Sequence, residues 1–341
     1  MKYIPRIPLP TFAFLMLFSA EFTYYLLILQ TGIVEYHHSL LSEVWMVPAG
    51  GMIGILLSIG AYPRRRWLMP SLLFVQLLLS FSYASANGWE LFLLGLISGL
   101  TAPMLIALVP RLWVVAVALA FSYLFGTWVF DVPAIDRTSI AVSLSAVALG
   151  ASFLGDMRPA KCGSGTVSLY SMGNIFLWLL LDAALFETLS RDAVMHLWGE
   201  EGFAFPIILF HLIGLAAAYG MRSYRHNDAL LLGLFAFAYA TYASGSQAWL
   251  CVVYPFVISY YNVVIMEKLI RLPYTKVAMA SLSLWAASGL GLLIALSHTF
   301  AIAWTVLGLL FVNYMAQSTG FRALFSLGKG FPLIPDKRSA L

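Results

Sequence analysis

The chain has 341 residues, of which 61% are hydrophobic and only 10% are charged, and its formal net charge is +4. Because soluble proteins contain about 25% charged residues, this composition excludes a water-soluble globular protein and indicates an integral membrane protein. The two cysteines, Cys162 and Cys251, are too few for a disulfide framework or a zinc site.

The first predicted helix, residues 11–33, contains one carboxylate, Glu21, near its centre. The segment is too long for the core of a signal peptide and no small-residue cleavage pattern follows, so we expect it to be retained. A charged group at the centre of a bilayer costs roughly 3 kcal/mol on insertion scales, which makes Glu21 a candidate functional residue. Tyr25 follows one turn later and shares the face of Glu21.

Hydropathy predicts twelve helices in all, most of them about as long as the hydrocarbon core of a bilayer requires. Helices are expected because lipid cannot satisfy backbone polar groups. The predicted spans are residues 11–33, 44–62, 67–84, 89–109, 112–131, 138–155, 167–188, 203–220, 229–245, 248–266, 276–297 and 300–319. The predicted fold class is therefore an all-α integral membrane protein with twelve transmembrane helices.

The basic residues predict the orientation of these spans. If the N-terminus is inside, all of the 19 Lys and Arg residues lie on the inner side except Arg137 and Arg191. Cytoplasmic loops of membrane proteins carry such an excess, so we expect both termini in the cytoplasm and a multi-pass protein of the cell (inner) membrane. Topology then accounts for the positive charge, and no nucleic-acid partner is expected.

The basic loops also repeat along the chain. Arg64 follows the second span and Arg222 follows the eighth, 158 residues later. A second pair, Arg111 and Arg271, gives an offset of 160 residues. This repeat predicts two six-helix halves, residues 1–157 and 158–341.

Six plus six helices with cytoplasmic ends resemble the major facilitator superfamily over the whole chain. The loop after the second span in that family usually has an acid, a glycine and paired basic residues. Here the loop reads SIGAYPRRRWLM, with Ala61 in place of the acid and no following glycine. The resemblance implies that Arg64, Arg65 and Arg66 belong to a gating loop. It also implies that spans 1 and 7 line a central cavity, and that spans 2 and 11, and 5 and 8, meet between the halves.

Small residues recur every fourth position in several spans and predict close helix contacts. These contacts suit either surfaces that slide between the halves or static packing. The stripes are Gly50, Gly54 and Ser58 in the second span, Gly95 and Gly99 in the fourth, Gly214 and Ala218 in the eighth, and Ser283, Ala287 and Gly291 in the eleventh.

Glu21, Asp182 and His211 are the ionisable residues predicted to lie away from helix ends, whereas Glu187 is placed at a helix end. Glu21 and Asp182 are 161 residues apart and so occupy nearly equivalent places in the two halves. Further polar and aromatic residues are candidates for the lining of the same cavity. They are Ser171, Asn174 and Trp178, which share one helix face with Asp182, and Tyr254, Tyr261 and Asn262 in the tenth span.

We expect Glu21, Asp182 or both to exchange protons, because low dielectric favours the neutral acid, or to bind a cationic group of the substrate. We also expect Glu21 to face span 7, close enough to Asp182 for direct or water-mediated contact. The alternative is that each acid is protonated and serves as structural glue between helices. His211 either relays protons or is a packing residue.

The function predicted from these features is a secondary transporter that moves a small solute by alternating access with proton coupling. One alternative is a non-transporting accessory or assembly protein with a protein partner, which the altered loop motif, the short linkers and the high aromatic content favour. A lesser alternative is a copper or other metal-ion transporter, since the chain has 13 Met and 6 His. No nucleotide-binding or hydrolase motif occurs, so we expect neither an enzyme nor a bound cofactor.

Overall fold

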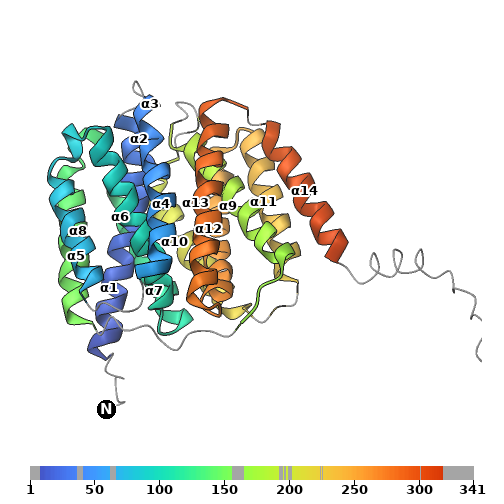
Figure 1. Cartoon of the computed structure of the whole chain (residues 1–341). Helices are drawn as coiled ribbons and strands as arrows, with labels where there is room; N and C mark the ends of the chain where they lie inside the picture. The colour runs from blue at the N-terminus through green and yellow to red at the C-terminus, as the bar shows by residue number, and fades with distance from the viewer. Residues whose placement is uncertain are drawn as a thin grey trace, which may run out of the picture.

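The computed structural model describes residues 8–36, 41–61, 67–155, 165–191, 195, 197–198, 202–222, 224, 226–299 and 301–317. These residues form helices and turns and no strand, with twelve helices of at least 14 residues (Figure 1). Each of the twelve overlaps one span predicted from hydropathy. The all-α prediction is confirmed for this part of the chain.

The long helices follow one another through short connections. In the first half of the chain they are α1 (Leu9–Tyr24), α4 (Met46–Ala61), α5 (Leu68–Phe81), α6 (Gly88–Ala107), α7 (Leu112–Trp128) and α8 (Thr138–Leu154). In the second half they are α9 (Leu169–Leu189), α10 (Ala204–Gly220), α11 (Asn227–Ala243), α12 (Gln247–Leu269), α13 (Tyr274–Leu296) and α14 (Ala301–Gln317). Short elements complete the chain: the π-helix η1 (Tyr25–Gly32), α2 (Ile33–Tyr36), α3 (Leu41–Val44), and the 3₁₀ turns η3 (Tyr83–Ser85) and η4 (Ala134–Asp136).

Five helices are long and apolar enough to cross a membrane, which fits a multi-pass membrane protein. They are Leu9–Glu35, Gly88–Ala107, Leu169–Leu189, Gln247–Leu269 and Tyr274–Leu296. Six more apolar helices have 10–17 residues.

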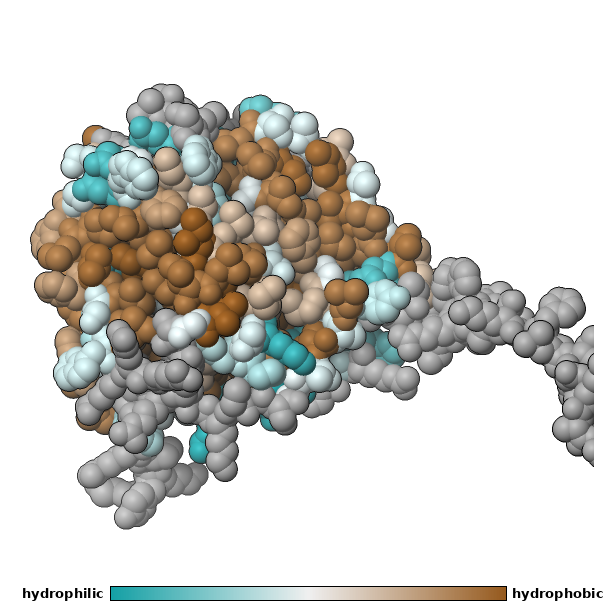
Figure 2. All heavy atoms as spheres, viewed as in Figure 1, coloured by the Kyte–Doolittle hydropathy of each residue, from teal (hydrophilic) through white to brown (hydrophobic). Residues whose placement is uncertain are grey.

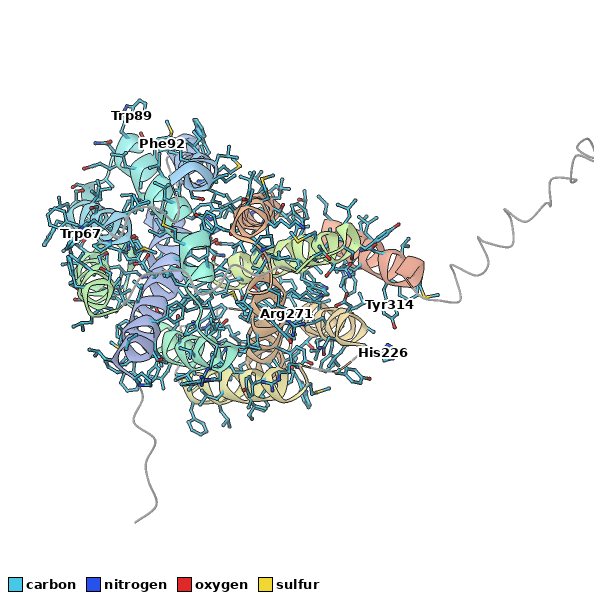
Figure 3. All side chains as sticks on the ribbon, turned by 60° about the horizontal axis from the view of Figure 1, so that its bottom comes forward. Trp67, Trp89, Phe92, His226, Arg271 and Tyr314 are labelled. Carbon is cyan, nitrogen blue, oxygen red and sulfur yellow. The ribbon has the colours of Figure 1, made fainter. Side chains whose placement is uncertain are left out.

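The surface shows the same character. A band of hydrophobic side chains crosses the middle of the visible face, and hydrophilic side chains gather above and below it (Figure 2). Trp67 and Trp89 point outward at the rim of the bundle (Figure 3) and are strongly exposed. Exposed tryptophans near helix ends are typical of the level at which a bilayer meets water.

The helix contacts recur along the chain. α4 packs on α6 and α10 packs on α12, while α1 packs on α7 and α9 packs on α13. In the same way, α1 and α5 both contact α8, and α9 and α11 both contact α14. Each pair is thus repeated six long helices later. α4 also packs on α13, and α7 on α10, which are the pairs that the resemblance places between two halves.

The predicted small-residue stripes lie where helix backbones touch. A Cβ atom at Gly54 would stand 2.1 Å from the carbonyl oxygen of Leu96, and one at Gly99 would stand 2.0 Å from that of Gly51. α4 and α6 therefore pack backbone to backbone. Gly214 faces α12 and Gly291 faces α9. These glycines contact helices of their own half, which favours static packing over sliding surfaces.

The first helix changes register in its middle. From Tyr25 to Gly32 it is a π-helix, and the Thr31 hydroxyl donates to the carbonyl oxygen of Leu26 at 2.9 Å. Arg137, which precedes α8, donates to the Leu27 carbonyl at 3.0 Å and to the Thr31 hydroxyl at 3.2 Å. Its guanidinium is buried, although the sequence placed Arg137 in an outer loop. Short π-helical segments inside α-helices are frequent at functional sites.

Candidate functional site

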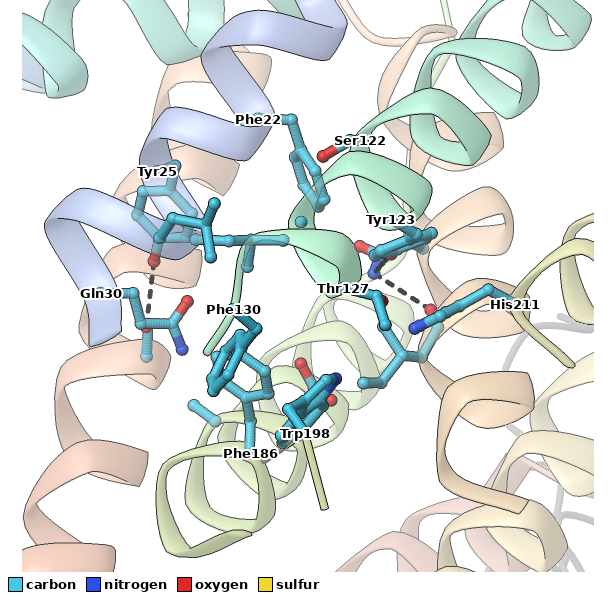
Figure 4. A pocket seen from close by; sticks show the side chains of 18 of the residues that line it. Phe22, Tyr25, Gln30, Ser122, Tyr123, Thr127, Phe130, Phe186, Trp198 and His211 are labelled. Carbon is cyan, nitrogen blue, oxygen red and sulfur yellow. Dashed lines mark hydrogen bonds between the residues drawn. The ribbon is translucent and has the colours of Figure 1, made fainter. Parts of the chain in front are cut away.

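A cavity of about 90 Å³ lies at the centre of the bundle (Figure 4). We call it the central cavity. Its lining comes from helices of both halves of the chain, namely α1 with η1, α7, α9, α10, α12 and α13. The lining residues with polar groups are Tyr25, Gln30, Ser122, Tyr123, Thr127, Asp182, Trp198, His211, Tyr261, Asn262 and Ser288.

A second cavity of about 180 Å³, the Glu21 cavity, lies beside the first and is lined by α1, α6, α9, α12 and α13. Four residues, Phe22, Tyr25, Leu179 and Asn262, line both cavities. Glu21 lines only the second cavity and Asp182 only the first. Two acids from different halves of the chain therefore line adjacent cavities.

Asp182 is held by two tyrosines of α12. The hydroxyl of Tyr254 donates to Asp182 Oδ1 at 2.9 Å and to the Asp182 carbonyl oxygen at 3.1 Å, and the hydroxyl of Tyr261 donates to Oδ2. Both carboxyl oxygens are thus acceptors, as suits an ionised carboxylate. No Lys or Arg side chain pairs with Asp182 among the described residues.

Glu21 has its hydrogen-bond partner on a different helix, α5. The amide of Gln76 on α5 donates to Glu21 Oε1 at 2.9 Å. Beyond it a hydrogen-bonded chain continues, in which Ser80 lies 3.0 Å from Ser145 and Tyr24 lies 2.9 Å from Ser80. This buried chain links α1 to α5 and α8, so Glu21 contributes to helix packing whatever else it does.

The direct contact of the two acids that we expected is not found. Glu21 binds α5 and Asp182 binds α12, with no hydrogen bond between them in the described part of the chain. Helical periodicity brings both acids to the inner side of the bundle, but it does not fix the rotation that points one carboxylate toward α5. The residues that line both cavities lie where a connection between them would have to pass.

His211 joins the two sets of helices. Its ring stacks on Tyr123 of α7, with 4.1 Å between the ring centroids, and its Nδ1 lies 2.8 Å from the hydroxyl of Ser259. Asn262 donates to the Tyr123 hydroxyl at 2.8 Å. His211 thus lines the central cavity as part of a hydrogen-bonded and stacked group. This position fits both a proton relay and a packing residue.

Tyr25 has the most central position of the predicted residues. It lines the central cavity, the Glu21 cavity and a third, smaller space. Its hydroxyl lies 3.1 Å from that of Ser288, and its ring packs against Trp285, both on α13. Tyr25 therefore connects the π-helix of the first half with a helix of the second half.

Asn174 and Trp178 lie away from both cavities, in contrast to the prediction. Asn174 donates to Asp228 at 3.1 Å, and Lys268 pairs with the same carboxylate at 3.0 Å. The Lys268 ammonium also lies 4.8 Å above the ring of Trp178. The shared helix face was predicted correctly, but its earlier turns pack against other helices than the turn that carries Asp182. The gating residues Arg64, Arg65 and Arg66 lie outside the described residues.

Three functional candidates escaped the sequence analysis. Gln76 is a polar, uncharged residue in a mainly apolar helix, and no periodic pattern in the sequence indicates it. Glu187 was placed at a helix end, yet it is buried beside a space of about 40 Å³, and its Oε2 accepts from Arg191. The spacing of four residues to Arg191 was the signal for this pair. Trp198 lies in the connection between α9 and α10 and no periodicity points to it.

Trp198 covers one side of the central cavity. Its ring lies 4.9 Å from that of Phe130 and 5.1 Å from that of Phe186, between ring centroids. It also meets Tyr254, the partner of Asp182, edge to face at 6.3 Å. The three rings of Phe130, Phe186 and Trp198 stand together at one end of the cavity (Figure 4). We call them the aromatic cap.

The described residues contain no group of three or more His, Cys, Asp and Glu side chains that could hold a metal ion. No protein-family model matches the chain, and no curated protein matches it. The two cavities and the residues around them are therefore the features that bear on function.

Proposed function

We propose that the protein is a secondary transporter that moves a small solute across a membrane by alternating access and couples this movement to protons. The observation that carries the proposal is the central cavity, where a carboxylate, a histidine and several hydroxyls gather inside an apolar bundle. Ionisable residues within membrane helices are costly and commonly mark substrate or proton pathways.

The architecture supports the proposal in a second way. Because the helix contacts recur after six long helices, the chain is suited to two six-helix halves with a site between them. We place both termini in the cytoplasm of a cell whose inner membrane holds the protein. The resemblance to the major facilitator superfamily then extends from topology to mechanism, with rocking of the halves exposing the cavity to one side at a time.

The candidates for the proton carrier are Glu21 and Asp182. An amide donor such as Gln76 can bind either an ionised carboxylate or the carbonyl oxygen of a protonated acid, so Glu21 can exchange a proton without losing this partner. Asp182 accepts two tyrosine hydroxyls and would lose part of this arrangement on protonation. The geometry therefore favours Glu21 as the group that changes its protonation state.

The test is flux in proteoliposomes that contain the purified protein and a pH-sensitive dye. Solutes that raise the melting temperature in a screen of amines, amino acids, sugars and metal ions are added outside under a proton gradient. We expect at least one of them to collapse the gradient, and Asp182→Asn to abolish this response. Asp131→Asn, the same change at an exposed aspartate, is the matched control. Co-purification of a partner protein without any flux would instead support the accessory alternative.

A further inference from the structure

The charge in the described lining of the central cavity is negative and not balanced by a cationic side chain. Among the described residues that line it, Asp182 is the acid, and none is Lys or Arg. His211 is the basic residue in the lining, and its Nδ1 and ring face are already engaged by Ser259 and Tyr123. A carboxylate that accepts two hydroxyl hydrogen bonds keeps further lone pairs free. The cavity thus offers negative charge without a cationic side chain to balance it.

Aromatic rings form a large part of the cavity walls. The aromatic cap stands at one end, and Tyr254 connects it to the carboxylate, because its ring meets Trp198 and its hydroxyl binds Asp182. Tyr25 and Tyr123 add further rings. Aromatic faces attract cations through their quadrupole, and such faces around one negative charge are the arrangement that recognises quaternary ammonium groups.

The volume limits the ligand. A cavity of about 150 Å³ in another protein holds benzene, with its six carbon atoms. The central cavity, at about 90 Å³, is smaller. By the same ratio of volume to atoms, it accommodates about four non-hydrogen atoms in this conformation. Sugars and most amino acids exceed this size, and an anion would be repelled by Asp182.

We propose that the central cavity is a binding site for a small organic cation of the alkylammonium class. The positive charge lies beside Asp182, and the alkyl groups contact the aromatic cap. The inference rests on the proposed function only in that this cation is the transported solute. It also gives the two acids different roles: Asp182 binds the cation, and Glu21, in the adjacent cavity, carries the proton.

The experiment compares trimethylammonium, a cation at neutral pH, with 2-propanol, a neutral molecule that also has four non-hydrogen atoms, by saturation-transfer NMR on the purified full chain. We expect trimethylammonium to bind and 2-propanol to bind at least about tenfold more weakly, a difference of about 1.4 kcal/mol. Asp182→Asn should weaken trimethylammonium binding at least about tenfold, whereas Asp131→Asn should leave it unchanged. Trp198→Leu, which keeps an apolar side chain, should weaken it as well.

Equal binding of the two probes, or unchanged trimethylammonium binding in both Asp182→Asn and Trp198→Leu, overturns the inference. If Asp182→Asn does not fold, the comparison of the two probes and the Trp198→Leu variant still decide. Flux in proteoliposomes separates the two proposals. Binding of trimethylammonium without its uptake supports the cation site and contradicts transport of this cation. Uptake of another solute without trimethylammonium binding supports transport and contradicts the cation site.

Discussion

Replacing Arg137 with methionine should destabilise the protein strongly, although Arg137 touches neither cavity. Its guanidinium donates to the carbonyl oxygens of Phe130 and Val132, both at 2.8 Å, and to that of Leu27 at 3.0 Å. Its side chain is 2% exposed. Methionine fills a similar volume without a hydrogen-bond donor, so the three carbonyls lose this partner while packing is largely kept.

The magnitude follows from these contacts. A buried polar group that loses its partner costs about 1–3 kcal/mol, and removal of one member of a buried ionic arrangement costs about 3–5 kcal/mol. The carboxylate of Glu35, 3.4 Å away, has a side chain that is 50% exposed, so water can solvate it and it adds little. We therefore expect a loss of about 3–5 kcal/mol for Arg137→Met. Arg137→Lys should lie between this variant and the wild type, because lysine keeps the charge but not the planar set of donors.

The assay is reversible unfolding in mixed micelles of mild detergent and dodecyl sulfate, followed by tryptophan fluorescence. The control is Arg271→Met, which removes a guanidinium that is 68% exposed, lies in the turn after α12 and pairs with Glu267 near the end of that helix. Surface pairs of this kind contribute about 0–1 kcal/mol. Equal unfolding free energies for Arg137→Met and Arg271→Met would refute the assignment of Arg137 as a buried structural donor.

Three further predictions concern helix packing, the proton and topology. Gly54→Ala should cost about 1–3 kcal/mol because α4 and α6 must separate, whereas Gly60→Ala on the same helix, with open space around it, should be neutral or stabilising in the same unfolding assay. Glu21→Gln should keep the fold but abolish proton-driven uptake while solute exchange persists, and normal gradient-driven uptake would exclude Glu21 as the carrier. Reporter fusions at Arg225 should signal cytoplasm and fusions at Glu200 the outside; an outside signal at Arg225 would contradict the proposed topology.

Much of the fold could be predicted from the sequence, because apolar length alone defines helices in lipid. Small-residue spacing also indicated the close contact of α4 with α6, since Gly54 and Gly99 allow the backbones to meet. The π-helix could not be predicted. A carbonyl oxygen within it accepts from Arg137, more than 100 residues away in sequence, and no local pattern in YLLILQTG reveals that contact.

The candidate site could be predicted only in part. Periodicity identified Asp182, and its two tyrosine partners came from the correct helix. The same periodicity misplaced Asn174 and Trp178, because residues on one helix face meet different neighbours at different heights of the bundle. Glu187 was missed because helix ends are uncertain by a few residues, and a shift of one turn decides whether a carboxylate is solvated or buried.

The π-helical register gives the first helix the effect of one extra residue between Tyr25 and Gly32. If the same residues were wound as an α-helix instead, with the length of the chain unchanged, every later side chain would turn by about 100°. Gln30 would then leave the central cavity, and the carbonyl oxygen and hydroxyl that Arg137 binds would face elsewhere. Length and register are thus coupled in this helix. At its present length the π register keeps Gln30 and the groups that bind Arg137 in place, whereas a chain one residue shorter could keep the later side chains on the same faces as a plain α-helix.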